Sequence, residues 1–375
     1  MGNTWNRITS NLISSTALIF VVIYALISRF YLYLTTPSTP SKRREWDDYK
    51  KYKNELITPD TKYYANQIGF DIVHQRIYTQ DGYELMVYLG NTRGVYNTGH
   101  KHLKKNDPKF WDYTIEDLAE QDLPCLIDHV KEDSNSPHLS FIGHSQGNGL
   151  AFMSLSLDYC PHLSNSISSF IALAPAVYAG PLTTGFPFTA IKDLDWKGWR
   201  VIFGDLDFIP LMTLAFNYTP KRAFALLGYQ MFAFLFSWTD KNWLNRRKAK
   251  MFRFTPSPVS SKSVHWWAGK DGFSTRGCTL ETSKERWFSS GEETDKSGIK
   301  IPKFPPLSLY VGTDDKLVLV EPLLERLKTH ENIKLRRVDY FDGGEHCDFF
   351  WAADAVEICF HKILQDIQLG VEDMQ

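Results

Sequence analysis

The chain has 375 residues, a formal net charge of −1 at pH 7 and a pI of about 6.8. This length allows one large core with a second, smaller subdomain, and the near-neutral charge gives no reason to expect a nucleic-acid partner. The five cysteines are odd in number and widely spaced, and no C-x-x-C pair occurs. They favour free thiols in a reducing compartment over a disulfide framework or a metal site.

An apolar segment at the N-terminus predicts a membrane anchor over residues 1–35. Between Arg7 and Arg29 lie 21 consecutive uncharged residues, enough for a helix to cross the hydrocarbon core of a bilayer. A cleaved signal peptide is the alternative, but no small-residue cleavage site follows closely. Because Arg29 and the basic residues 42–44 outnumber Arg7, we expect a single-pass anchor with the remainder of the chain in the cytosol, on the endoplasmic reticulum or a lipid droplet.

Residues 36–64 are predicted to be a polar linker, and residues 65–178 the first part of a folded core. Within this part, Thr114-Ile115-Glu116-Asp117 is typical of a helix start, with a threonine cap and acidic residues in the first turn.

The most informative motif is Gly143-His144-Ser145-Gln146-Gly147. A short apolar stretch at 139–142 precedes it, as expected of a buried strand, and residues 148–155 can form a helix. A G-x-S-x-G sequence between a strand and a helix predicts a nucleophile elbow, a sharp turn that exposes the serine. We expect a strained backbone at Ser145, and we expect both flanking glycines to be required because a side chain there would collide with neighbouring elements.

Residues 179–303 are predicted to be a cap inserted into the core. The uncharged, aromatic-rich stretch 223–239 fits either a buried helix or a lid that meets lipid, and it is short for a second membrane span. The basic residues 246–250 just beyond it would suit an anionic membrane surface. Residues 289–298 are predicted, by composition, to be a flexible polar loop.

Residues 304–375 return to the core with two more predicted strands, 307–312 and 335–341. The acidic pair Asp314-Asp315 follows the first strand, and a glycine-rich loop ending in His346 follows the second. Parallel sheets place their active sites just beyond the carboxyl ends of strands, and α/β-hydrolases carry serine, acid and histidine in this order. Each residue alone fits a solvated turn or a surface histidine, but the ordered set favours a catalytic triad.

Several further motifs resemble the acid lipase and sterol esterase branch of the α/β-hydrolases, which includes gastric and lysosomal lipases and membrane-anchored fungal steryl ester hydrolases. They are Asp81-Gly82-Tyr83, Leu89-Gly90-Asn91-Thr92-Arg93-Gly94, Phe110-Trp111-Asp112, Asp122-Leu123-Pro124, Ala172-Leu173-Ala174-Pro175-Ala176 and His346-Cys347-Asp348-Phe349-Phe350-Trp351.

This resemblance implies an α/β-hydrolase fold, with a mostly parallel doubly wound sheet and a mainly helical cap. It implies a hydrolase of steryl esters or triacylglycerols that needs no cofactor or metal and works at a membrane or lipid-droplet surface. It selects Asp315 over Asp314 as the acid beside Ser145 and His346, and it makes the backbone N–H of Gln146 one oxyanion donor. The acyl acceptor and the oligomeric state are not implied.

One segment of the family pattern is missing. In the family, a central strand, a His-Gly oxyanion loop and a helix separate the D-G-Y and L-G-N-x-R-G motifs, whereas here the two motifs are nearly adjacent and no His-Gly dipeptide occurs. We expect residues 85–89 to move beside residues 141–143, because a gap in the sheet would leave buried backbone groups unpaired. We also expect weak activity. The alternatives are an inactive relative that binds lipid or a partner, and an enzyme for thioesters or small esters.

Overall fold

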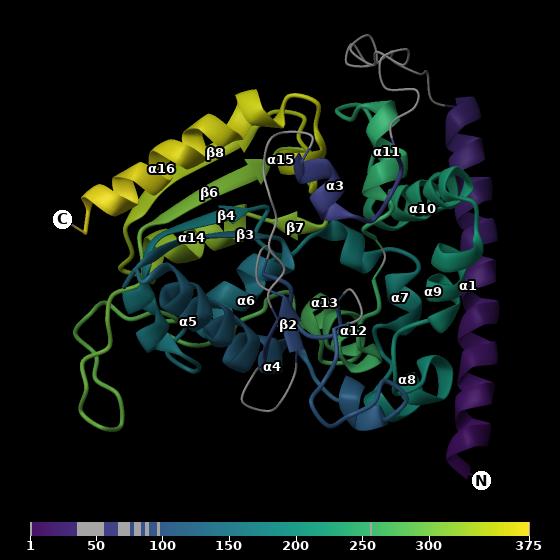
Figure 1. The fold of residues 1–375 in the computed structure, drawn as a ribbon, viewed down its shortest axis with the longest axis horizontal. Helices are drawn as coiled ribbons and strands as arrows, with labels where there is room; N and C mark the ends of the chain where they lie inside the picture. Colours follow the sequence, from purple (N-terminus) through teal and green to yellow (C-terminus); the bar gives the residue numbers. More distant parts are fainter. Residues whose placement is uncertain are drawn as a thin grey trace.

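The structure is a computed structural model that describes residues 2–35, 56–66, 76–78, 84–86, 90–95, 98–255 and 257–374 (Figure 1). Its strands are β1 (Arg76–Tyr78), β2 (Glu84–Met86), β3 (Leu139–His144), β4 (Ile167–Leu173), β5 (Tyr178–Ala179), β6 (Leu307–Gly312), β7 (Val318–Leu319) and β8 (Leu335–Phe341). Its helices are α1 (Gly2–Thr35), α3 (Thr61–Asn66), α4 (Ile115–Asp117), α5 (Leu123–Ser134), α6 (Gln146–Ser154), α7 (Phe188–Ile191), α8 (Trp196–Phe203), α9 (Pro210–Tyr218), α10 (Lys221–Phe236), α11 (Asn245–Met251), α12 (Ser261–Ala268), α13 (Phe273–Arg276), α14 (Glu321–Thr329), α15 (Asp348–Trp351) and α16 (His361–Glu372).

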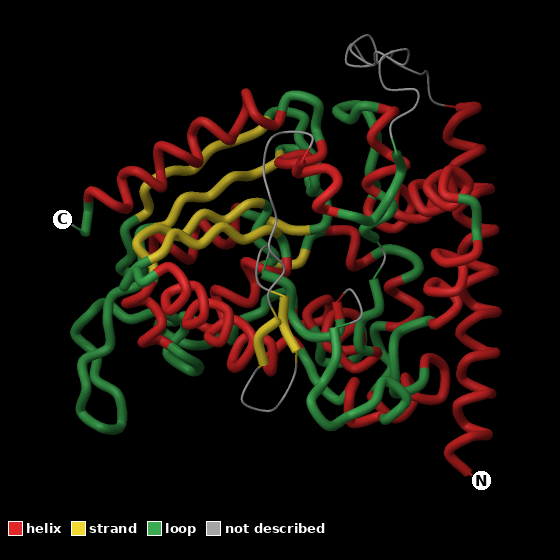
Figure 2. Tube along the Cα trace, viewed as in Figure 1, coloured by secondary structure: helices red, strands yellow, loops and turns green. Residues whose placement is uncertain are grey.

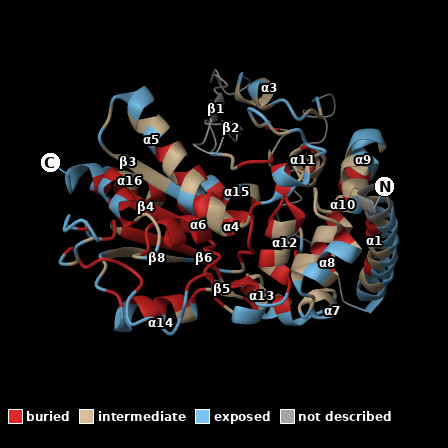
Figure 3. Ribbon diagram, turned by 90° about the horizontal axis from the view of Figure 1, so that it is seen from below, coloured by how far each residue is buried: buried red, intermediate tan, exposed pale blue. Residues whose placement is uncertain are grey.

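Among the described residues, the core is a parallel sheet in the order β3-β4-β6-β8, drawn in yellow in Figure 2. Side chains alternate between its two faces, as a strand requires. On β4, Phe170 packs in a cluster with α4, α5, α6 and α14, whereas Ile171 packs with α15 and α16 on the other face. Helices therefore cover both faces, β4 and β6 are wholly buried, and the fold is of the α/β class (Figure 3).

The predicted local elements of the core are confirmed. Strands β6 and β8 have the predicted bounds, and β3 and α6 flank Ser145. The Thr114 side chain and the Asp117 side chain form a capping box at the start of α4. Strands β1 and β2 pair antiparallel. The D-G-Y motif at 81–83 lies outside the described residues.

Two of the family-like motifs are joined by a buried ion pair. Arg93 Nη2 lies 2.6 Å from Asp122 Oδ1, with side chains 1% and 0% exposed, and the Arg93 backbone N–H donates to Asp122 Oδ2 at 2.7 Å. A buried charge needs such a partner, because losing either one leaves the other uncompensated. These residues therefore fix the chain that enters the core ahead of α5.

The expectation that residues 85–89 lie beside β3 is wrong for Leu85 and Met86. Residues 87–89 lie outside the described part of the chain. Leu85 pairs with Ile77 of β1, while β3 is hydrogen-bonded in the described sheet only to β4. The physical reason is solvation. The edge of β3 that has no partner in the described sheet lines an open groove, so solvent can reach its backbone groups and the desolvation cost that motivated the prediction does not arise.

Helices α7 to α13 lie between β5 and β6 in the chain, within the region predicted as a cap, whose boundaries stay a prediction. The stretch 223–239 forms most of α10. Phe224, Tyr229 and Ala233 are buried, whereas Leu226 is 61% exposed, so α10 is a core helix with one apolar exposed side. The basic residues of α11 are engaged within the protein: Lys248 pairs with Asp240, and Lys250 lies over the Tyr64 ring.

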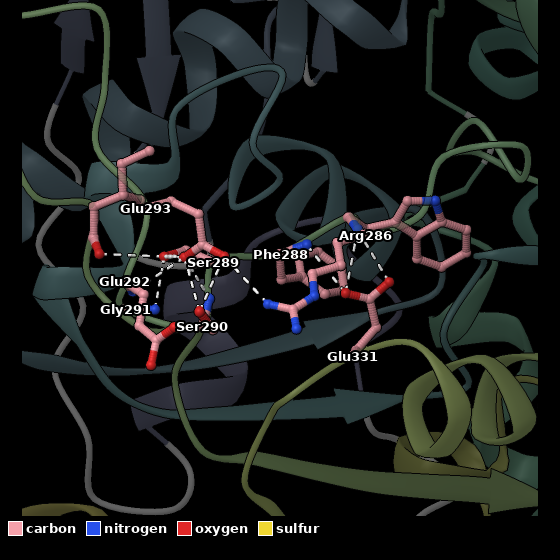
Figure 4. Close-up of polar contacts among 10 residues, drawn as sticks. Arg286, Phe288, Ser289, Ser290, Gly291, Glu292, Glu293 and Glu331 are labelled. Atoms are coloured by element: carbon pink, nitrogen blue, oxygen red, sulfur yellow. Dashed lines mark hydrogen bonds and ion pairs between the residues drawn. The ribbon is translucent and has the colours of Figure 1, made fainter.

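The predicted loop at 289–298 begins with an ordered turn (Figure 4). Glu293 accepts hydrogen bonds from Ser289 Oγ at 2.9 Å and from the Ser290 backbone N–H at 2.8 Å. Although burial acts to raise the pKa of Glu293, hydrogen bonds from its own backbone N–H, from Ser289 and from Ser290 lower it to about 2. Beside this turn, Glu331 accepts the Phe288 N–H at 3.2 Å and pairs with Arg326. The chain between α13 and β6 is thus anchored by two carboxylates.

The N-terminal helix α1 stands at the edge of the molecule, along α8, α9 and α10 (Figure 1). Residues Arg7–Thr35 are long and apolar enough to cross a membrane.

Candidate active site

The turn after β3 has the geometry of a nucleophile elbow. Ser145 has φ 51° and ψ −115°, a conformation that a non-glycine residue rarely adopts, and its N–H donates to the Leu173 carbonyl at 3.1 Å. Gly143 is required, because a Cβ there would lie 2.1 Å from Asn148 Oδ1. The expected strain at the serine is therefore present, and the surrounding hydrogen bonds hold it.

The expected collision at the second flanking glycine is wrong. A Cβ on Gly147 would meet no heavy atom within 4 Å beyond its own helix, because Gly147 faces the groove along β3. The close approach lies two residues later, where a Cβ on Gly149 would stand 2.9 Å from the Ala176 carbonyl oxygen.

The structure brings the three predicted catalytic residues into one line. His346 Nε2 lies 2.7 Å from Ser145 Oγ, and His346 Nδ1 lies 2.7 Å from Asp315 Oδ2. The carboxylate can only accept, so it holds the proton on Nδ1 and leaves Nε2 to accept from the serine hydroxyl. The side chains of His346 and Asp315 are 4% and 3% exposed. This arrangement can draw a proton from the serine during attack on a carbonyl carbon.

Asp315 and its neighbour Asp314 have different environments. Asp315 Oδ1 accepts the Leu317 N–H at 2.8 Å, which leaves Oδ2 directed at the histidine. Asp314 points away from the site, is 47% exposed and pairs with Lys241 of the cap. Only the first carboxylate touches His346.

Gln146, the predicted oxyanion donor, is the first residue of α6. The first N–H groups of a helix have no acceptor within the helix, and they lie at its positive dipole end. The Gln146 side chain is occupied elsewhere, because its Oε1 accepts a hydrogen bond from Trp267 Nε1 of α12 at 3.0 Å. This contact ties the elbow to a cap helix.

Sequence reasoning missed His144, which precedes the nucleophile. Its Nε2 donates to the carbonyl oxygen of His346 at 2.8 Å, and its ring lies edge-on to Phe350. Burial, with the nearby His346 as a second cause, lowers the pKa of His144 to about 3, so the ring is neutral near pH 7. The position beside Ser145 was the only signal for it in the sequence.

Sequence reasoning also missed the contacts that clamp the histidine loop to the cap. Asp348 accepts from Trp243 Nε1 at 2.7 Å and from Asn242 Nδ2 at 2.6 Å. Glu345 accepts from the backbone N–H and the hydroxyl of Thr239, at 2.8 and 2.7 Å. Both carboxylates are buried, and both flank His346 in the chain. The cap segment 239–243 therefore fixes the loop that carries the histidine.

A groove of about 480 Å³ runs along the outer edge of β3 to the elbow. Its walls include Leu126 of α5, Phe141 of β3 and, next to the serine, Gln146 and Gly147. It lies on the side of β3 that has no partner strand in the described sheet.

The described residues include no group of three or more His, Cys, Asp or Glu side chains placed to hold a metal ion. All five cysteines are free, and Cys347, next to His346, is buried with its thiol pKa raised by that burial.

The chain matches no family model. It is 31% identical over 312 residues to sterol esterase 2 of Saccharomyces cerevisiae, an alignment that covers 75% of this chain and 57% of that protein. It is 27% identical to lipase lipl-1 of Caenorhabditis elegans and 26% identical to the gastric triacylglycerol lipase of Mus musculus. These two alignments cover 79% and 76% of this chain, and 74% and 71% of the relatives.

The chain thus spans little more than half the length of the yeast sterol esterase. The alignment is 312 positions long, whereas 75% of the 375 residues of this chain is fewer than 312 residues. The yeast protein therefore has residues within the aligned span that this chain lacks. Among solved structures, a soluble variant of the Saccharomyces cerevisiae monoglyceride lipase is similar, with 16% identity and a TM-score of 0.42, over 75% of this chain and 76% of that one. With the elbow, the sheet order and these relatives together, the chain belongs to the acid lipase and sterol esterase family of the α/β-hydrolases.

Proposed function

We propose that this chain is a serine carboxylic ester hydrolase of neutral lipids. The observation that supports this most strongly is the continuous line from Ser145 Oγ through His346 to Asp315, with both contacts at 2.7 Å. Nucleophile, base and orienting acid are in hydrogen-bond reach without any rearrangement, which is the geometric requirement for this chemistry.

In the proposed reaction, Ser145 Oγ attacks the ester carbonyl carbon while His346 Nε2 takes the serine proton. The negative charge that develops on the carbonyl oxygen is stabilised by the Gln146 backbone N–H at the start of α6. His346 then returns the proton to the departing alcohol, and the acyl group stays on the serine. A water molecule, deprotonated by the same histidine, releases the acid and restores the serine. Asp315 keeps the imidazole oriented throughout.

We infer the substrate class from the names of the relatives, which are a sterol esterase and a triacylglycerol lipase. We propose long-chain esters of one of these alcohols, at a membrane or lipid-droplet surface reached through α1. A chain beginning near Ser41 should lose membrane association and keep the folded core.

The decisive experiment compares Ser145→Ala with the parent chain. The variant should lose hydrolysis of a long-chain ester and labelling by a fluorophosphonate probe together. Asp315→Asn should lower kcat by about 10⁴-fold, whereas Asp314→Asn, the matched neighbour, should change it little.

Activity retained in Ser145→Ala would refute the assignment. A parent chain that neither labels nor hydrolyses would favour the alternative of a lipid-binding relative, and a preference for short acyl chains would favour the small-ester reading.

A further inference from the structure

Helix α1 packs against the cap along one side and over nearly its whole apolar length. Near its start, Ser10 approaches Gly204 at the end of α8, where a Cβ on the glycine would lie 3.2 Å from Ser10 Oγ. Towards its other end, Arg29 Nε donates to Gln230 Oε1 of α10 at 3.2 Å. Between these contacts, the ring of Tyr24 lies edge-on to Phe234 of α10, with centroids 5.6 Å apart.

The packed side of α1 is a stripe of small residues. Ser10, Ser14 and Ala25 are 2%, 0% and 1% exposed, and their spacing puts them on one face of the helix. Small side chains allow two helices to approach closely. The two serine hydroxyls donate to the carbonyls of Arg7 and Asn11 in their own helix, so no polar group is stranded in this contact.

This packing is incompatible with a helix that crosses a bilayer. The contacts from residue 10 to residue 29 extend for about 28 Å at 1.5 Å per residue, close to the roughly 30 Å of bilayer hydrocarbon. Figure 1 shows the globular part of the molecule beside α1 at every level of that length. If α1 spanned the membrane as packed here, α8 with its Arg200–Asp205 ion pair would lie in hydrocarbon, where charged side chains are costly.

The opposite side of α1 is apolar and exposed, so an apolar environment suits it better than water. Leu12, Phe20 and Ile27 are 68%, 62% and 63% exposed, and only 6% of the apolar window of this helix is buried. In Figure 3, which looks nearly along α1, the visible side of the helix that faces away from the rest of the molecule is mostly pale blue. A continuous apolar surface of this length is far larger than the scattered apolar residues of a soluble surface, and lipid is the partner that fits it.

We propose that α1 lies in the plane of the membrane, with its small-residue side held by α8 and α10 and its apolar side immersed in one leaflet. Such helices typically enter the boundary between headgroups and acyl chains by about 5–10 Å. The cap then rests on the membrane surface and is not held at a distance by a tether, and both ends of α1 lie on the same side of the bilayer. This differs from the single-pass topology expected from the sequence, and it does not depend on the proposed esterase activity.

The test uses the full chain with an epitope tag at each end, inserted into sealed microsomes. After flotation selects the membrane-bound chain, protease is added outside the vesicles, and a soluble lumenal protein reports that they stay closed. An in-plane helix predicts the same fate for both tags, either both digested or both protected. One digested and one protected tag would show that α1 spans the membrane, and chain that does not float with the vesicles would show that no leaflet covers it. Either result overturns the proposal.

A matched pair of variants tests the role of the cap contact. Ala25→Trp puts a large side chain into the 1% exposed side, whereas Ile23→Trp changes the 52% exposed outer side. In Ala25→Trp, α1 should separate from α10, and in a fraction of the molecules one tag should be digested while the other is protected. Ile23→Trp should keep the pattern of the parent chain. Equal behaviour of the two variants would show that packing against the cap does not set the orientation.

Discussion

His144 Nε2 donates a hydrogen bond to the backbone carbonyl oxygen of His346, with 2.8 Å between the two atoms. The residue before the nucleophile thus holds the backbone of the residue that activates it. Because the ring of His144 is neutral near pH 7, it adds no positive charge beside the imidazolium that would form at His346 during acyl transfer.

Replacing His144 should therefore impair catalysis more than binding. In His144→Phe, the ring contact with Phe350 is kept, but the buried carbonyl loses its donor, at a cost of about 1–3 kcal/mol. We expect kcat to fall about 5- to 150-fold, with KM within about twofold. His144→Gln, which restores an amide donor, should recover part of the loss. Steady-state kinetics on a long-chain ester measure both values, and equal kcat for the two variants would contradict this role.

The clamp on the histidine loop should contribute to stability. Asp348→Asn places an amide N–H₂ against the Trp243, Asn242 and Glu345 donors, of which at least one then has no acceptor. The free energy of unfolding should fall by about 1–3 kcal/mol. Asp314→Asn removes only the exposed pair with Lys241 and should change it by less than about 1 kcal/mol. Denaturant unfolding of the detergent-solubilised chain compares them, and similar losses would argue against the clamp.

Glu345 predicts a pH dependence of stability. Burial raises its pKa from 4.5 to about 7, while the Thr239 hydrogen bonds oppose the shift. A raised folded-state pKa means that the folded chain binds a proton that the unfolded chain releases. The stability from this group is complete below pH 4.5 and is lost as the pH rises through 7, by up to about 3 kcal/mol. Glu345→Gln should remove this loss. Melting temperatures from pH 4.5 to 8 test it, and parallel curves for the two chains would refute it.

The missing family segment predicts low activity and a way to restore it. Inserting the family's strand and His-Gly loop between Leu85 and Met86 should supply the second oxyanion donor and occupy the groove along β3. One such donor typically changes kcat by about 10² to 10³. A glycine-serine insert of equal length is the matched control and should give no gain. Turnover of the unmodified chain at the level of full-length relatives would show the prediction wrong.

Local patterns in the sequence predicted the elements and the chemical roles. The apolar runs before Ser145 and Asp315 predicted β3 and β6, because a buried strand needs continuous apolar residues. The order of serine, acid and histidine predicted which residues meet. These features depend on neighbours in the chain, so one sequence contains them.

Tertiary structure decided the features that depend on which surfaces face each other. Leu85 pairs with β1, the edge of β3 without a partner in the described sheet lines an open groove, and Gly147 faces the same groove. The hydrogen bond from His144 and the carboxylates of Glu345 and Asp348 join segments far apart in the chain, so no local pattern marks them. The 21 uncharged residues of α1 specify that it avoids water, but whether lipid surrounds it or the cap covers one side depends on packing between helices.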